Sequence, residues 1–233
     1  MRIGQVFHVF AVVLISGIAS EATAQHSSAR WIPVTRSELC VTEGSIEQLP
    51  GQPLAVNVAK MRAYVNRRTQ PVAEARFSYL GPTANEAPLA SGEMRRQFGL
   101  KLRAQDACNL VYAMWRIEPE SKVVVSVKSN PGQHTSAQCS NHGYQNIKPG
   151  YSAPVPALRA GDTHTLRAEM NGQGMRVFTD DNLVWQGSVG PGALEFDGPI
   201  GVRSDNARLM IDLKTGAPAG PATAASCRGP ESE

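Results

Sequence analysis

The sequence lacks the motifs that identify the commonest nucleotide-, zinc- and serine-dependent enzymes. It has no G-x-S-x-G elbow, no P-loop, no H-E-x-x-H pair and no dinucleotide-binding glycine fingerprint. The E-x-D-x-x-E carboxylates of a retaining glucanase are also missing. These absences argue against those enzyme classes. They leave open a binding protein, a structural protein or an enzyme of another kind.

The chain has little net charge and few long apolar runs. It carries 23 Lys and Arg against 20 Asp and Glu, a formal net charge of +3, without a concentrated basic stripe. Nucleic-acid-binding proteins normally have such a stripe, so we expect no nucleic-acid partner. After the N-terminus no segment is apolar over the roughly 20 residues that a membrane span requires, so we expect no span in the mature protein.

The N-terminus has the three parts of an export signal. A positively charged start is followed by an apolar stretch from Val6 to Ile18 and by the small-x-small cleavage pattern Ala22-Thr23-Ala24. The pattern predicts a signal peptide over residues 1–24, with Gln25 as the first mature residue. We therefore expect a secreted or periplasmic protein.

Cysteine is scarce, and none of the four lies in a C-x-x-C pair, so zinc and thiol-redox spacings are missing. An even number of cysteines in an exported chain indicates disulfides, and three pairings are open. We favour Cys108–Cys139, which ties a strand to a nearby loop. Cys40–Cys227 then joins the two ends of the domain, a closure worth about 5 kcal/mol in the chain-entropy model.

Apolar residues alternate along most of the chain, and no amphipathic helical window appears after the signal peptide. Short strands separated by glycine-rich or Asp/Asn turns predict an all-β, two-sheet antiparallel sandwich. The predicted strand segments are 53–66, 75–81, 96–105, 108–117, 121–129, a three-strand meander over 161–187, and two short strands over 199–213 around a Ser-Asp-Asn turn.

The two ends of the chain differ in amino-acid composition from this β region. Residues 25–50 are polar and are predicted to form an irregular arm, in which Trp31 serves as a lid over a sheet edge. The segment 214–233 is rich in Ala, Pro and Gly and is predicted to be a tail tethered by Cys227. A single domain over 51–213 remains between them.

The meander carries a histidine, a glutamate and two aspartates that invite a catalytic or metal interpretation. His164 and Glu169 are an odd number of residues apart on a strand, so their side chains leave opposite faces. Asp180 and Asp181 are explained by turn formation, as are Asp205-Asn206. Calcium is chemically compatible with such oxygen groups, but no dense ligand run indicates it, so we expect no cofactor.

The meander with the segment after it resembles a known group of domains. Gly161-Asp162 open a strand, Phe178 to Trp185 supply a hairpin, and "GPIGVR" at 198–203 supplies a closing strand pair. The pattern, over roughly residues 75–213, is similar to that of bacterial concanavalin A-like jelly-roll domains. These include laminin-G-like modules and the secreted 3-keto-disaccharide hydrolase family. The resemblance implies a jelly-roll fold, which binding modules, hydrolases and lyases share.

A candidate binding surface lies on one face of the predicted central strands. Lys101 and Arg103 share a strand face, Tyr112 and Arg116 share a face of the next strand, and Lys128 lies on a third. If these faces coincide, they form a cationic groove suited to carboxylate or sulfate, with a tyrosine ring for stacking. The alternative is a solvated outer face with scattered cations, because register between strands cannot be read from sequence.

The segment 130–156 is too long and polar for a simple hairpin, and long loops of this kind often carry function. His134, His142, Tyr144 and Gln145 are its candidate ligand contacts.

These observations favour a monomeric, exported module that binds carbohydrate or a cell-envelope polysaccharide, with an anionic glycan as the ligand. One alternative is a glycoside-processing hydrolase resembling the 3-keto-disaccharide family, which requires carboxylate, histidine or metal groups in the groove. A second is a structural or adhesion module, which requires an exposed apolar patch.

Overall fold

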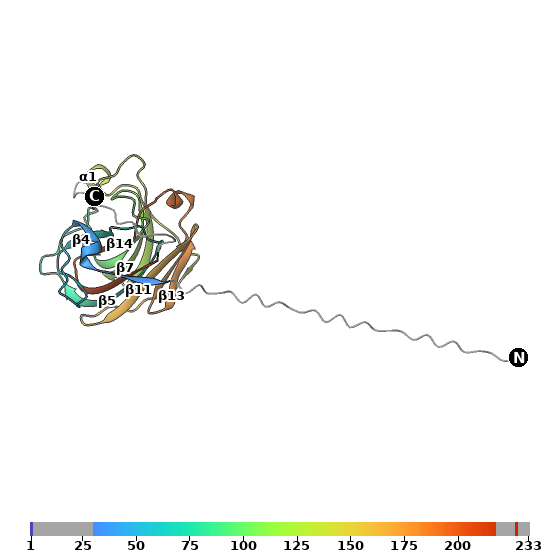
Figure 1. Ribbon diagram of the computed structural model, residues 1–233, viewed down its shortest axis with the longest axis horizontal. Helices are drawn as coiled ribbons and strands as arrows, with labels where there is room; N and C mark the ends of the chain where they lie inside the picture. The colour runs from blue at the N-terminus through green and yellow to red at the C-terminus, as the bar shows by residue number, and fades with distance from the viewer. Residues whose placement is uncertain (2–29, 218–226, 228–233) are drawn as a thin grey trace.

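The computed structural model describes residues 1, 30–217 and 227, and it consists of two antiparallel β-sheets packed face to face (Figure 1). The predicted all-β sandwich is therefore confirmed. The expected signal peptide lies outside the described residues, apart from Met1. Among the residues that the structure describes, no helix has the length and apolar character to cross a membrane.

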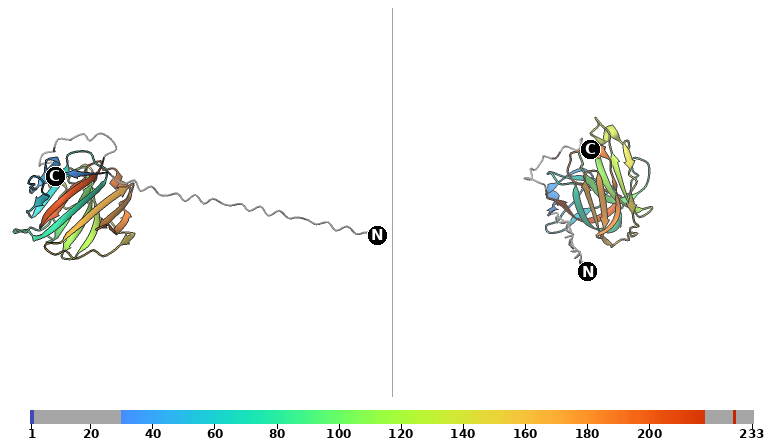
Figure 2. Two further views of the ribbon diagram at one scale, coloured as in Figure 1. Left: turned by 60° about the horizontal axis from the view of Figure 1, so that its bottom comes forward. Right: turned by 90° about the vertical axis from the view of Figure 1, so that its right-hand side faces the viewer.

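The first sheet, sheet A, has eight strands in the order β1-β15-β5-β11-β12-β13-β10, with β3 also paired to β15. Its long strands cross the molecule side by side in the left view of Figure 2. The bounds are β1 (Trp31–Val34), β3 (Leu54–Val56), β5 (Val72–Pro82), β10 (Tyr151–Ser152), β11 (Thr163–Asn171), β12 (Gly174–Thr179), β13 (Asn182–Ser188) and β15 (Ala207–Gly216).

The second sheet, sheet B, has seven strands in the order β2-β4-β14-β6-β7-β8-β9. They are β2 (Leu39–Glu43), β4 (Lys60–Val65), β6 (Arg96–Leu102), β7 (Leu110–Glu118), β8 (Lys122–Lys128), β9 (Tyr144–Asn146) and β14 (Gly201–Asp205). The helical elements are single turns: η1 (Arg36–Glu38), α1 (Ser136–Cys139) and η2 (Pro191–Leu194).

The core lies between the sheets and is built from the inward residues of alternating strands. Phe77 of sheet A packs on Phe98 of sheet B with ring centroids 4.8 Å apart, and it meets the edge of Trp115 at 5.7 Å. All three side chains are at most 1% exposed. Burying an aromatic side chain of this size stabilises the fold by roughly 2–3 kcal/mol, so this trio is a main contact between the sheets.

The meander predicted over 161–187 is confirmed as β11, β12 and β13, which pair in sequence order. Asp180 and Asp181 form the turn between β12 and β13 with positive φ angles of 48° and 62°. The Asp180 carboxylate binds His164 Nδ1 at 2.6 Å, and the His164 ring lies 5.4 Å from the core Trp115 ring. Glu169 pairs instead with Arg176. The histidine and the glutamate therefore do not converge.

The two strands expected over 199–213, around the Ser-Asp-Asn turn, are present as β14 and β15. β14 and β15 do not pair with each other, because the chain passes from sheet B to sheet A between them. Asn206, at the crossing, has a positive φ of 56°, is buried, and hydrogen-bonds to the backbone of Ala87 and Arg95 through its side chain. Sequence patterns show a turn here, but a turn between two sheets and a hairpin turn share the same residue types.

The arm expected over 25–50 is partly regular within its described residues. Trp31 belongs to β1, which pairs with β15, so it is part of a sheet edge and not a lid. Leu39 and Cys40 begin β2, which pairs with β4. Only some residues of these edge strands are buried, so their alternation is weak and the sequence pattern underestimates them.

Both favoured disulfides are present. Cys108 and Cys139 have Cα atoms 5.9 Å apart, and Cys40 and Cys227 have Cα atoms 5.3 Å apart. β15 continues to Gly216, a little past the expected domain end at 213. Two disulfides are typical of proteins that mature in an oxidising compartment.

Candidate functional site

The outer face of sheet B, directed away from the core, carries the candidate site. On β7, Val111, Ala113 and Trp115 point into the core, so the alternate residues Tyr112 and Arg116 point outward. The outer residues of the neighbouring strands are unusually polar for a sheet face, and several are nonetheless almost fully buried.

Strand register places these outer residues in rows across the sheet. One row runs through Asn146, Ser126, Tyr112, Lys101 and Gly201.

The next two rows follow along the strands. The second runs through Val124, Met114, Gly99, Arg203 and Arg62, and the third through Lys122, Arg116, Gln97, Asp205 and Lys60. Cationic residues from five strands are thereby brought onto one surface.

Glycine at position 99 shapes the middle of this surface. Gly99 lies between Arg203 on β14 and Met114 on β7. Because it has no side chain, Arg203 reaches across β6. Its guanidinium carbon lies 5.2 Å from the centre of the Tyr112 ring, and its Nη1 donates to the Tyr144 hydroxyl at 3.1 Å. A Cβ at Gly99 would lie 2.3 Å from the Ala113 carbonyl oxygen, so no other residue fits without movement.

A buried carboxylate holds two arginines of this surface, Arg62 and Arg203, in place. Asp205 accepts hydrogen bonds from Arg62 at 2.6 Å, Gln97 at 2.7 Å and Arg203 at 2.9 Å. Burial alone would raise the pKa of Asp205, but Arg203 and Arg62 outweigh it and lower the pKa to about 2. Burial likewise opposes the charge of Arg203, yet Asp205 raises its pKa well above the ordinary value. Asp205 and Arg203 are therefore both charged at neutral pH.

Two tyrosines form the aromatic part of this surface, which is the floor of the cavity described below. The rings of Tyr112 and Tyr144 are stacked with centroids 5.9 Å apart, and Lys128 Nζ lies 5.0 Å from the centre of the Tyr144 ring. Burial and the neighbouring Tyr112 raise the pKa of Tyr144, against the opposing effect of Arg203 and Lys128. Tyr144 is thus a neutral phenol at physiological pH, with 38% of its surface exposed.

The Cys108–Cys139 disulfide holds the loop that borders this surface on one side and forms one wall of the cavity. Lys128 Nζ donates to the carbonyl oxygens of Ala107 at 3.1 Å and Ser140 at 3.0 Å, which flank Cys108 and Cys139 in the chain. The ammonium group and the disulfide together attach the loop after β8 to the loop before β7.

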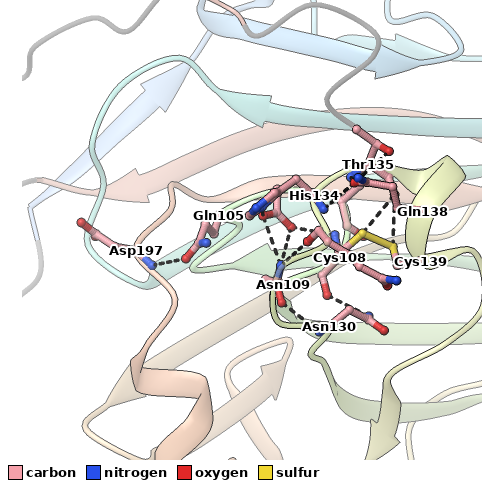
Figure 3. A network of polar contacts seen from close by, with 12 residues as sticks. Gln105, Cys108, Asn109, Asn130, His134, Thr135, Gln138, Cys139 and Asp197 are labelled. Atoms are coloured by element: carbon pink, nitrogen blue, oxygen red, sulfur yellow. Dashed lines mark hydrogen bonds and ion pairs between the residues drawn. A yellow bond between two sulfur atoms is a disulfide. The ribbon is translucent and has the colours of Figure 1, made fainter.

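A polar network continues this attachment away from the sheet (Figure 3). The buried Asp106 accepts hydrogen bonds from the Cys108 backbone N–H at 2.8 Å and from Asn109 Nδ2 at 3.0 Å, and its other oxygen contacts His134 Nδ1 at 2.7 Å. The Asn109 side-chain oxygen accepts from the backbone of Asn130 at 2.9 Å. The network fixes the shape of the loop, and His134 serves that structure instead of lining the site.

Floor and walls enclose a cavity of about 410 Å³, here called the cationic cavity. A second wall comes from the loop between β5 and β6, which contributes Leu89, Ser91, Glu93 and Arg95. Seven cationic residues line the cavity against two carboxylates: Lys60, Arg62, Arg95, Lys101, Arg116, Lys128 and Arg203, against Glu43 and Glu93. Both carboxylates are ion-paired with arginine, to Arg62 and Arg95 respectively.

Five of the candidate residues from the sequence meet in this cavity: Lys101, Tyr112, Arg116, Lys128 and Tyr144. His134 belongs to the network around Asp106, and the structure does not bring Arg103, His142 and Gln145 to the cavity either.

Each exception has a local cause. Arg103 follows the end of β6 with a positive φ of 49°, so strand alternation no longer applies, and its guanidinium donates to the Leu194 carbonyl at 2.7 Å. Gln145 lies between Tyr144 and Asn146 on β9 and so leaves the opposite face. His142 sits in the exposed turn before β9.

Sequence reasoning missed Arg62, Arg95 and Arg203. Alternation in "KMRAYV" and "GVRSD" does place Arg62 and Arg203 on outward faces. What is not readable is that β4 and β14 pair beside β6, because these strands come from distant parts of the chain. Arg95 precedes its strand, where no periodic signal exists.

No metal centre is evident within the described residues, which contain no group of three or more His, Cys, Asp or Glu that could hold an ion. Asp180 and Asp205, the carboxylates considered for calcium, are bound to His164 and to two arginines.

Comparison with known proteins defines the fold. No protein-family model matches the sequence, and no curated protein matches it. Among solved structures, the chain is similar to the carbohydrate-binding module CBM66 from Bacillus subtilis, with 13% identity, a TM-score of 0.51, and coverage of 75% of this chain and 91% of that one. A mutant of the Emp46p carbohydrate recognition domain gives 11% identity, a TM-score of 0.51, and coverage of 77% and 88%.

The Crh5 transglycosylase in complex with NAG gives 12% identity, a TM-score of 0.50, and coverage of 83% and 86%. At these identities the likeness shows the fold alone. The chain has the concanavalin-like jelly-roll fold that its strand motifs resemble.

Proposed function

We propose that the protein is an exported module that binds an anionic glycan in the cationic cavity. The observation that carries the proposal is the stacked pair of Tyr112 and Tyr144, set among Arg203, Lys128 and Lys101 on the cavity floor. A sugar ring packs its C–H face on a tyrosine ring, while ammonium and guanidinium groups donate to hydroxyl, carboxylate or sulfate oxygens.

The structural neighbours support carbohydrate as the ligand class. They are named as a carbohydrate-binding module, a carbohydrate recognition domain and a transglycosylase in complex with NAG. The anionic character rests on this chain alone, because seven cationic residues line the cavity against two paired carboxylates. Export rests on the N-terminal signal pattern and the two disulfides.

The hydrolase alternative has little support in the described cavity. No histidine lines it, and its carboxylates Glu43 and Glu93 are each engaged by an arginine, which leaves no acid–base pair for glycoside hydrolysis.

The test is a glycan array probed with the purified, disulfide-bonded protein, followed by product analysis of every glycan that binds. We expect retention of acidic polysaccharides that weakens as ionic strength rises, because salt screens the cavity charges. Binding to neutral glycans only would contradict the anionic ligand. Cleavage products would establish the enzyme instead, and an array without signal would favour an adhesion module.

A further inference from the structure

The end of the cationic cavity farthest from Tyr144 contains an arginine with an incomplete set of contacts. Arg116 lies on the outer face of β7 and lines the cavity. Its Nε is buried and has no hydrogen-bond partner within the described part of the chain. A partly buried guanidinium is normally hydrogen-bonded, since removing it from water is costly.

The other three arginines of the cavity each form an ion pair with a carboxylate. Arg62 and Arg203 both bind Asp205, and Arg95 is paired with Glu93. Each of these three arginines therefore has a direct ion pair, whereas Glu93 and Glu120 act on Arg116 only through charge interactions.

A second positive charge lies in the same cavity. Arg95, in the loop before β6, repels Arg116, and only Glu93 and Glu120 oppose that repulsion. Burial lowers the pKa of Arg116, and Arg95 lowers it further. An anion placed between the two guanidinium groups would remove the repulsion and satisfy the buried donor at once.

We infer that Arg116, assisted by Arg95, is the contact for a carboxylate or sulfate group of an acidic oligosaccharide. The inference rests on the proposed function and specifies its ligand. Arg116 and Tyr112 are four residues apart on one strand face, about 13 Å. A single sugar ring cannot reach both. The ligand is therefore a chain whose acidic unit binds at Arg116 while another unit stacks on the exposed ring of Tyr144, which packs on Tyr112.

The test compares Arg116→Gln with Arg103→Gln, a matched arginine outside the cavity. Calorimetry measures binding of polygalacturonate and heparin hexasaccharides, together with carboxyl-reduced and desulfated counterparts. We expect Arg116→Gln to weaken binding of an acidic probe at least tenfold and to leave binding of its neutral counterpart unchanged. The difference in affinity between the two probes should therefore be smaller for the variant than for the wild type. Arg103→Gln should match the wild type. The probe that responds, uronate or sulfated, identifies the acidic group.

Thermal unfolding is the second measurement. Because Arg116→Gln removes a partly buried charge that Arg95 repels and a buried Nε without a hydrogen-bond partner, we expect an unchanged or raised Tm, which shows that lost binding is not lost folding. Equal loss for acidic and neutral probes, or no loss, would overturn the Arg116 contact while leaving carbohydrate binding intact. Absence of wild-type binding to every probe would overturn the proposed function and this inference together.

Discussion

The Tyr144 hydroxyl on β9 accepts a hydrogen bond from Arg203 on β14 at 3.1 Å, although three strands lie between β14 and β9 in sheet B. The contact spans the floor of the cationic cavity and joins its aromatic part to the buried cluster around Asp205. It exists because the intervening outer position on β6 is Gly99. The geometry of the cavity therefore depends on a residue that contributes no functional group.

Replacing Gly99 with alanine tests this dependence. The added Cβ would meet the Ala113 carbonyl oxygen at 2.3 Å and the Met114 sulfur at 2.5 Å. We expect a loss of about 1–3 kcal/mol in the free energy of unfolding, measured with urea, because overpacking of this kind is not easily relieved. Glycan affinity should fall as well.

The control is Gly192→Ala, where no atom lies within 4 Å of the added Cβ. Its stability should stay within about 0.5 kcal/mol of the wild type. Equal effects of the two substitutions would show that Gly99 has no special role.

The Gly99 relationship also marks the limit of sequence reasoning. Alternation along single strands gives Tyr112 and Arg116 a shared face and Lys101 one face of its own strand, and in the structure all three line the cavity, because face assignment depends only on local periodicity. Which strands lie side by side depends on non-local pairing, which leaves no local pattern. For the same reason the approach of Arg203 to Tyr112 could not be predicted. Arg103 was misplaced because the strand ends one residue earlier.

Removing the charge of Asp205 should destabilise the fold. Asp205→Asn leaves Arg62 and Arg203 without their shared buried carboxylate, and breaking a buried ion pair in this way costs about 3–5 kcal/mol. Asp197→Asn is the control, because its ion pair with Arg68 is exposed and should contribute less than about 1 kcal/mol. Chemical denaturation compares the two, and similar losses would contradict a structural role for the cluster.

Asp205 also predicts a pH dependence of stability. Its folded pKa, about 2, lies below the unfolded value near 3.9, so the folded state favours the ionised form. The resulting stabilisation is fully present above about pH 4 and is lost as the pH falls toward 2. Urea unfolding of the wild type should show this loss. Asp205→Asn should have a flatter profile over that range, and an unchanged slope would refute the assignment.

The two disulfides should have separable effects. In the chain-entropy model, Cys108–Cys139 closes 31 residues and contributes about 3–4 kcal/mol, whereas Cys40–Cys227 closes 187 and contributes about 5 kcal/mol. Replacing both cysteines of a pair with serine should therefore destabilise the fold more at Cys40–Cys227. Glycan affinity should fall only for Cys108–Cys139, which holds the cavity wall. Unfolding and binding assays measure both effects. A loss of glycan affinity in the Cys40/Cys227 variant but not in the Cys108/Cys139 variant would contradict the role of Cys108–Cys139 in holding the cavity wall.

Tyr144 and Tyr151 are the two tyrosines with the largest exposed fractions in the described chain, 38% and 50%, but only Tyr144 lines the cavity. Tyr144→Ala removes a stacking surface and the acceptor for Arg203, so glycan affinity should fall about tenfold or more, equivalent to about 1.4 kcal/mol. Tyr144→Phe keeps the ring and should retain most of the affinity if stacking dominates. Tyr151→Ala should bind like the wild type. Calorimetry with the best array ligand measures all three. Equal losses for Tyr144→Phe and Tyr144→Ala would assign the contribution to the hydroxyl group, and a loss for Tyr151→Ala would place the ligand on the edge of sheet A instead.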